Sequence, residues 1–314
     1  MLNRRQIRIK LFQVFFAYYS EEKPDVVQYE KLMHQSFERF RDLYLLLIML
    51  IGEMQGVAIE KIEAGKNKKL PTFEDLHPNT KFVANSLLRM IVNSKKLSKE
   101  AKDRTLSWSD QKDLLKGIFK QLTETPDYKE YMASKERGFQ HDREYLVRFF
   151  KREMVNFESL HDHLEEQTVL WADDLDLAAS MVLKSLKSVN EDDDDITLLP
   201  LWKEDDDDKS FTLELWRATL ALGESSEKLI AKVATNWESD RIALSDMILM
   251  KMALAEVQTF DQIPVKVTMN EYIELSKYYS TPKSSNFING VLDQLFTDLK
   301  GKKKIKKTGR GLVE

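Results

Sequence analysis

The sequence contains no cysteine and no uninterrupted apolar run long enough to cross a membrane. Without cysteine the chain forms no disulfide and offers no thiolate or cysteine-based zinc site, which suits a reducing compartment. The longest apolar run, Leu43 to Ile51, is nine residues long, whereas a membrane-spanning helix needs roughly 20. The first ten residues carry four basic side chains, so we expect no signal peptide. These absences predict a soluble, cytoplasmic protein.

Motifs that mark common enzyme classes are also missing. No G-x-S-x-G, H-E-x-x-H or G-x-G-x-x-G pattern occurs. A phosphate-binding loop at Gly65-Lys66 is excluded because Glu60 stands where its first glycine is needed and Asn67 where it needs a hydroxyl. His161 and His163 are two positions apart, so they lie on different faces of a helix and do not share a metal there. We expect no enzyme activity, no metal, no cofactor and no small-molecule substrate.

The charge is unevenly distributed along the chain. The formal net charge is −4, yet residues 1–20 hold four basic and no acidic side chains, and residues 300–310 add seven more basic ones. Ten acidic residues fill positions 191–195 and 204–208. Each block alone is typical of a solvated loop or tail. Basic ends on a mildly acidic body nevertheless favour a local polyanion site over a general nucleic-acid coat.

The N-terminal residues 3–19 are predicted to form a helix. Asn3 followed by Gln6 resembles a capping box, and apolar residues from Ile7 to Tyr18 recur on one face. Cations near a helix N-terminus oppose the helix dipole by roughly 0.3–1 kcal/mol each, so helix stability does not explain the basic residues of the first two turns. A bound anion and a solvated basic face remain open as explanations of these three arginines, Arg4, Arg5 and Arg8.

A second pair of helices is predicted between Ile263 and Lys300. Pro264 marks the start of the first, which Thr268 would cap while Glu271 reaches back to it. In the second helix, apolar residues at spacings of three and four form one buried stripe: Ile288, Leu292, Leu295, Phe296 and Leu299. Free backbone N–H groups at its start would suit an anion, and polar residues gather there: Ser284, Ser285, Asn286 and Asn289.

The periodicity between these ends is also helical, so we predict an all-α fold. Helical patterns occupy residues 26–54, 82–92, 110–122, 126–133, 145–164, 170–186, 226–237 and 242–257. Thr125-Pro126 is a typical helix start, with threonine as the cap. Residues 191–208 are expected to be a flexible acidic connection, and residues 300–314 a disordered basic tail.

Three segments of the sequence resemble the NusB family of transcription antitermination proteins. They are NRRQIRIKLFQVFFAYY at the N-terminus, NWESDRIALSDMILMKMALAEV at Asn236–Val257, and IPVKV-x-x-NEYIELSK followed by SSNFINGVLD. Their order matches that of the family. The resemblance implies a NusB-like helical bundle formed by residues 1–56 and 209–299, with residues 57–208 as a large helical insertion.

The resemblance also implies a function. Family members bind the boxA element of nascent ribosomal transcripts together with the ribosomal protein NusE, join RNA polymerase in an antitermination complex and suppress termination. The implied RNA-binding residues here are Arg4, Arg5 and Arg8, with Lys277 and Lys283 and the polar residues of the last helix start. Asp246 would face the protein partner, and Phe287 either stacks on a base or packs in the core. Gln6 and Lys283 depart from the family pattern.

Two functions of other classes compete with this one. The fold resembles the N-terminal domain of certain ribosomal RNA cytosine methyltransferases, but their cysteine nucleophiles and α/β catalytic domain are missing here. A helical protein-interaction scaffold with weak, generic RNA binding remains the alternative, with residues 57–208 as its working surface.

Overall fold

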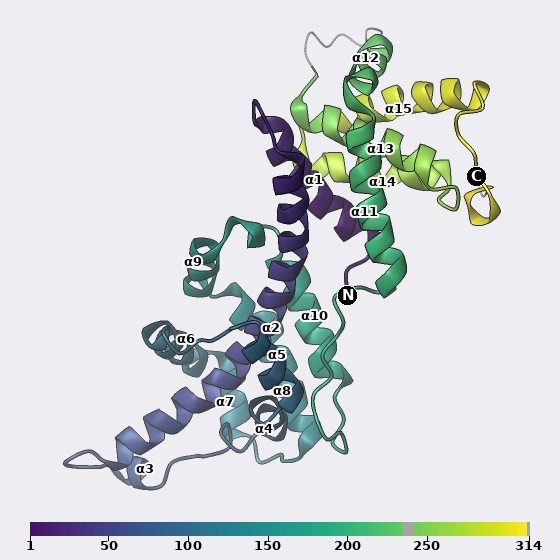
Figure 1. Cartoon of the computed structure of the whole chain (residues 1–314). Coiled ribbons are helices and arrows are strands. Elements are labelled where there is room, and N and C mark those ends of the chain that lie inside the picture. The colour runs from purple at the N-terminus through teal and green to yellow at the C-terminus, as the bar shows by residue number, and fades with distance from the viewer. Residues whose placement is uncertain (235–241, 313–314) are drawn as a thin grey trace. The chain divides into compact units, whose positions relative to one another are not determined.

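Figure 1 shows a computed structural model of the chain, in which residues 1–234 and 242–312 are described. Over these residues the chain is helical and has no β-strand; an isolated parallel bridge joins Leu2 and Trp202. The predicted all-α fold is confirmed. The chain divides into two compact units, Met1–Gln35 with Leu201–Glu314, and Ser36–Pro200.

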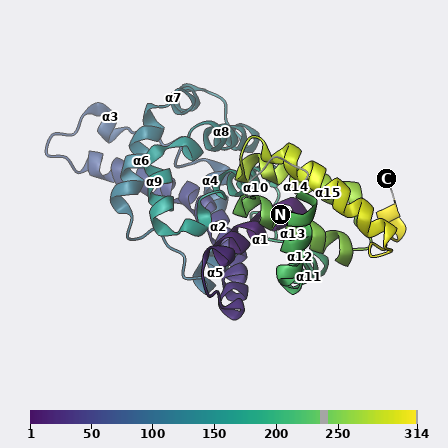
Figure 2. The same cartoon turned by 90° about the horizontal axis from the view of Figure 1, so that it is seen from above.

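The first unit is organised around α13 (Leu244–Thr259). Every residue of α13 from Ile248 to Val257 is buried, so this helix is covered on all sides, as its dense apolar pattern predicts. In Figures 1 and 2, α14 and α15 lie side by side, and both pack on α13. The helices around α13 are α1 (Arg4–Ser20), α11 (Asp205–Ala221), α12 (Gly223–Ala234), α14 (Val265–Tyr279) and α15 (Ser284–Gly301). Trp237, the predicted end of α12, lies outside the described residues.

The two C-terminal helices agree with the sequence in their core but not in one cap. All five residues of the predicted α15 stripe are buried. Pro264 directly precedes α14, as expected. Thr268, however, lies inside α14 and is fully buried, so it does not cap the helix. Its hydroxyl donates to the Glu256 carboxylate at 2.8 Å instead.

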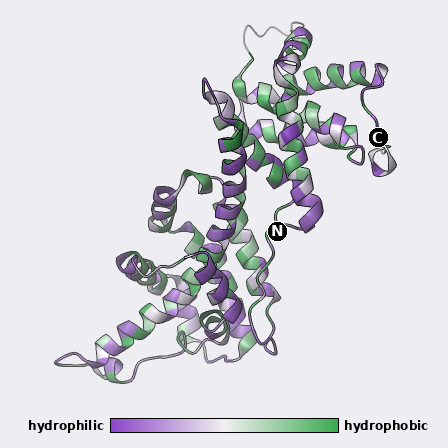
Figure 3. Cartoon of the chain, viewed as in Figure 1, coloured by the Kyte–Doolittle hydropathy of each residue, from purple (hydrophilic) through white to green (hydrophobic). Residues whose placement is uncertain are grey.

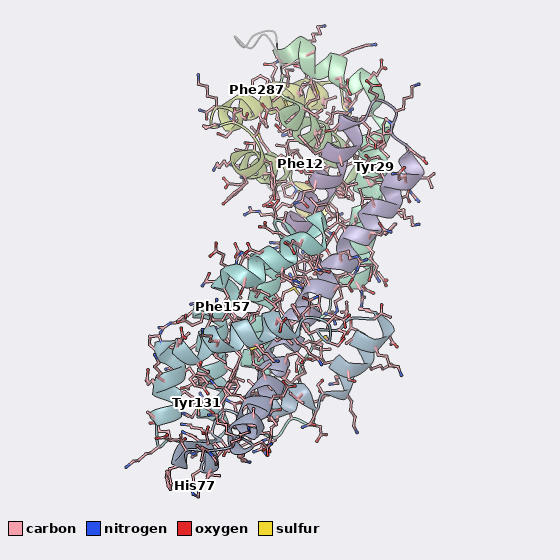
Figure 4. The ribbon with its side chains drawn as sticks, turned by 90° about the vertical axis from the view of Figure 1, so that its left-hand side faces the viewer. Phe12, Tyr29, His77, Tyr131, Phe157 and Phe287 are labelled. Carbon is pink, nitrogen blue, oxygen red and sulfur yellow. The ribbon has the colours of Figure 1, made fainter. Side chains whose placement is uncertain are left out.

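The second unit contains the rest of α2 (Val26–Lys66) and eight shorter α-helices. Thr125 caps α7, with Pro126 at the first helical position, as predicted. Tyr131 of α7, labelled in Figure 4, stacks on Tyr145 of α8 with 3.9 Å between ring centroids. The shorter helices are α3 (Phe73–Leu76), α4 (Ser86–Val92), α5 (Lys95–Asp103), α6 (Lys112–Glu124), α7 (Pro126–Ala133), α8 (Phe139–Arg152), α9 (Glu158–Gln167) and α10 (Leu175–Ser188). α3 and α5 were not predicted, and the helical pattern predicted at residues 145–164 is interrupted between α8 and α9.

Helix α2 is long and apolar enough, by composition alone, to cross a membrane. Its most apolar 18-residue window has a mean hydropathy of 1.6, but 67% of that window is buried inside the structure. Such burial is typical of the core helix of a soluble protein.

Two charged segments differ from the expected flexible connection and disordered tail. Residues 205–208 form the first turn of α11, drawn as hydrophilic in Figure 3, because carboxylates are favourable at a helix N-terminus. Residues 302–312 fold back along the loop after α13. The Lys307 ammonium donates to the Phe260 carbonyl at 2.8 Å. The Thr308 backbone N–H donates to the Asp261 carbonyl at 3.1 Å.

Candidate nucleic-acid interface

The start of α1 is fixed by its cap. The Asn3 side chain accepts from the backbone N–H groups of Arg5 and Gln6, at 2.9 and 3.2 Å, and the Gln6 side chain accepts from the backbone N–H of Asn3 at 3.0 Å. The predicted capping box is confirmed. This cap sets the directions in which the arginines of the first two turns project.

Arg8 points into the protein core. Its side chain is only 3% exposed and makes a two-pronged ion pair with the fully buried Glu256, with Nε–Oε2 and Nη2–Oε1 distances of 2.6 and 2.8 Å. Burial by itself lowers the pKa of Arg8, but the Glu256 carboxylate outweighs burial and raises that pKa above its ordinary value. The anion that accounts for this cation near a helix start is therefore an internal carboxylate, and Arg8 is not available to a phosphate.

Glu256 has four hydrogen-bond donors. Besides the two from Arg8, it accepts from the Thr268 hydroxyl at 2.8 Å and from the Tyr272 hydroxyl at 3.0 Å. Burial, and then the neighbouring Glu256 charge, raise the pKa of Tyr272 well above its ordinary value. A buried charge is tolerated only when it is paired and hydrogen-bonded, and this network meets both conditions. It joins α1, α13 and α14.

Arg4 and Arg5 also have internal partners but stay accessible. Arg5 donates through Nε and Nη2 to the carboxylate of Glu271 on α14, at 2.9 and 2.8 Å. The hydrogen bond from Arg5 outweighs the effect of burial and lowers the pKa of Glu271. Arg4 pairs with Asp207 in the first turn of α11. The side chains of Arg4 and Arg5 remain 34% and 47% exposed, so both could exchange a carboxylate for a phosphate.

An internal carboxylate also stands at the start of α15. Asp246 of α13 is buried and accepts from the hydroxyls of Ser280 and Ser284, the latter at 2.8 Å. Ser284 is itself buried. A negative charge there suits the free N–H groups and dipole of the helix start. Asp246 therefore faces inward, contrary to the partner-facing position expected of it, and Ser284 does not face solvent.

The other predicted residues line the corner between α14 and α15. Lys283, Asn286 and Asn289 are exposed, and Ser285 is half-buried. The side chain of Lys277 is 50% exposed and forms a local ion pair with Glu274. Phe287 is half-buried and lies on α15 (Figure 4), so both of its predicted roles stay open.

Two exposed aromatic residues near this corner were not predicted. Tyr278 is 81% exposed at the end of α14, and Phe16 is 44% exposed on α1. Phe12 connects the two helices, because its ring lies 5.1 Å from that of Tyr279 and 6.1 Å from that of Phe16. The signal in the sequence was weak. It consists of two pairs of adjacent aromatic residues, Phe15-Phe16 and Tyr278-Tyr279, and one member of each pair is exposed.

The corner thus combines cations, amide side chains and an exposed ring. Cations neutralise phosphates, and an aromatic face can stack on an unpaired base. Over residues 1–234 and 242–312, no group of three or more histidine or acidic side chains is arranged to hold a metal ion. The cations and the exposed ring together make this surface suited to an anionic polymer.

Fold and surface together define an all-helical protein with a cationic and aromatic corner, and comparison with known proteins gives its family. A family model described as the NusB family matches residues 176–296. The chain is 39% identical over 143 residues to the transcription antitermination protein NusB of Salinibacter ruber, covering 43% of this chain and 89% of that protein. It is 42% identical over 106 residues to that of Chloroherpeton thalassium, covering 34% of this chain and 50% of that protein. No solved structure matches the chain. The chain belongs to the NusB family.

Proposed function

We propose that this chain is a transcription antitermination factor that binds boxA-type single-stranded RNA in nascent ribosomal transcripts. In this proposal it acts with the ribosomal protein NusE and joins the RNA polymerase antitermination complex. The observation that carries the proposal is the match to the Salinibacter ruber antitermination protein, which extends over 89% of that relative. We propose further that residues 57–208 are a helical insertion into a NusB-like core.

The RNA surface in this proposal is the α14–α15 corner with the outer edge of α1. Lys283 neutralises a phosphate, and Lys277 does so when phosphate replaces Glu274. The amides of Asn286 and Asn289 and the Ser285 hydroxyl donate hydrogen bonds. The exposed ring of Tyr278 stacks on a base. Arg4 and Arg5 contribute only when phosphate replaces Asp207 and Glu271, so their net gain is small. Arg8 supports this surface from beneath by holding α1 to α13 and α14.

Fluorescence anisotropy tests the proposal. A boxA-like RNA and a scrambled RNA of equal length are titrated at several salt concentrations, with and without NusE. Log K should fall by about 0.7 per neutralised phosphate against log salt, so three to four contacts give a slope of roughly −2 to −3. We expect tighter binding of the boxA-like RNA, enhanced by NusE. Equal affinity for both RNAs in the presence of NusE would contradict the proposal.

The alternative is a helical interaction scaffold with weak, generic RNA binding. One observation favours it: each arginine near the start of α1 already has a carboxylate partner within the chain. In that case both RNAs bind weakly, with the same salt dependence and no effect of NusE.

A further inference from the structure

A groove of about 610 Å³ lies along α2 in the second unit, and Figure 1 shows the position of this helix. Its walls come from α2, α4 and α5, and its α2 residues recur from Met49 to Ile59. Ten residues of helix correspond to about 15 Å, or nearly three turns. The groove therefore has the length of a short helix segment.

The groove is mostly apolar, with Gln55, Ser94 and Ser98 among its polar lining residues, and it is partly uncovered. Ile59 and Val92, on its two sides, are 43% and 49% exposed. Gly52 and Gly56 of α2 form part of the lining. A Cβ at Gly52 would touch the methyl groups of Ile91 and Val92 at 3.4 Å, whereas a Cβ at Gly56 would meet no atom within 4 Å. At Gly56 the backbone of α2 is therefore open to close approach by another chain.

One carboxylate in the groove has no counter-charge among the described residues. Glu53 is half-buried in the lining, and burial raises the pKa of its carboxyl. Among the residues that the structure describes, none forms an ion pair or hydrogen bond with Glu53. Lys102 of α5 also lines the groove but is exposed and makes no ion pair with Glu53. A half-buried carboxylate without a partner favours an occupant that brings a cation.

We propose that this groove binds one amphipathic helix of a partner protein, whose apolar face covers the groove and whose lysine or arginine pairs with Glu53. This is the helix-in-groove mode of recognition, with apolar anchors at i, i+3, i+4 and i+7. Gly56 lets the partner backbone come close. The charge at Glu53 also argues against the other occupants. A second copy packed symmetrically here would bring two Glu53 carboxylates toward each other, and RNA would meet a carboxylate on an apolar surface.

Peptide display on the full chain tests the proposal. A random library of 16-residue peptides is selected on the wild-type protein, with Gly56→Met as the counter-selection bait. The expected winners are amphipathic, with apolar residues at helical spacing and a central lysine or arginine. The proposal would be overturned if the selected peptides lacked helical periodicity or were acidic. It would also be overturned if no peptide distinguished the wild-type protein from Gly56→Met.

Three variants sharpen the test with the best peptide. Gly56→Met should lower affinity at least about tenfold, because the new side chain fills the groove. Gly117→Met is the matched control: Gly117 is also an exposed helical glycine with no atom near its Cβ position, and we expect affinity within about twofold of wild type. Both substitutions raise helix propensity, so neither should unfold the chain. Glu53→Gln should weaken binding about fivefold; an unchanged affinity would remove the cation from the proposal.

Discussion

Arg8 and Glu256, 248 positions apart, form a buried two-pronged ion pair between α1 and α13. Their side chains are 3% and 0% exposed. Thr268 and Tyr272 of α14 complete the hydrogen bonding of the carboxylate. This network thus fixes α1, α13 and α14 to one another at a single charged point, and two of these helices, α1 and α14, carry part of the candidate RNA surface.

Removal of the Glu256 charge should destabilise the protein strongly. Glu256→Gln keeps the shape but leaves Arg8 buried without a counter-charge, which typically costs about 3–5 kcal/mol. The free energy of unfolding from urea titrations measures the loss. Arg5→Gln is the control, because the pair that Arg5 makes with Glu271 is partly exposed and should contribute less than about 1 kcal/mol. Similar losses for the two variants would contradict a structural role specific to Glu256.

Local features of this fold could be predicted from sequence, and long-range pairs could not. The Asn3–Gln6 box, the Thr125 cap and the α15 stripe each depend on residues within about three turns of one helix, where spacing determines geometry. Arg8 looked like a phosphate ligand because its partner lies 248 positions away. Thr268 looked like a cap because Glu271 follows it by three positions, but α14 already begins at Val265, and the Thr268 hydroxyl donates to Glu256 of α13 instead.

The same limit applies to the start of α15. Its polar residues have the pattern of an anion site, and an anion is present, but it is Asp246 of the same chain. Sequence spacing indicates what kind of group a helix start binds, not whether that group is internal or external.

The Arg5–Glu271 pair should contribute to stability only above acidic pH. Arg5 lowers the pKa of Glu271 in the folded protein, so the contribution is complete above the unfolded-state pKa of about 4.3. It is lost as pH falls through the lower folded-state value. Urea titrations of wild type and Arg5→Ala between about pH 3 and 6 should therefore differ most at pH 6 and converge at the acidic end. A difference that stays constant across this range would exclude the ion pair as its cause.

Asp246→Asn should weaken the fold but leave partner affinity unchanged in folded protein. The substitution removes the charge that accepts from Ser280 and Ser284 at the start of α15, at a cost of about 1–3 kcal/mol. Thermal unfolding gives the stability, and titration with NusE at low temperature gives the affinity. Lost affinity with unchanged stability would instead support the partner-facing role expected from the family resemblance.

Tyr278→Ala should weaken RNA binding by about 1–3 kcal/mol if the ring stacks on a base. Because the side chain is 81% exposed, the melting temperature should not change. Tyr278→Phe keeps the ring and should retain affinity. Lys283→Ala should make the slope of log K against log salt less negative by about 0.7. If Tyr278→Ala and Lys283→Ala both kept wild-type affinity, RNA would not bind at the α14–α15 corner.

Gly311→Ala should release the C-terminal segment, residues 302–312, from the loop after α13. A Cβ at Gly311 would lie 1.9 Å from the Asp261 carbonyl oxygen, a contact that requires movement of the backbone. In wild type, Lys307 and Thr308 hold this segment to residues 260–261, so trypsin should cut slowly after Lys307.

Gly311→Ala should speed that cleavage while the melting temperature of the helical unit stays close to wild type. Gly301→Ala is the matched control, since a Cβ there meets no atom within 4 Å. Equal cleavage rates for the two variants would show that the close approach of Gly311 to Asp261 does not hold the segment in place.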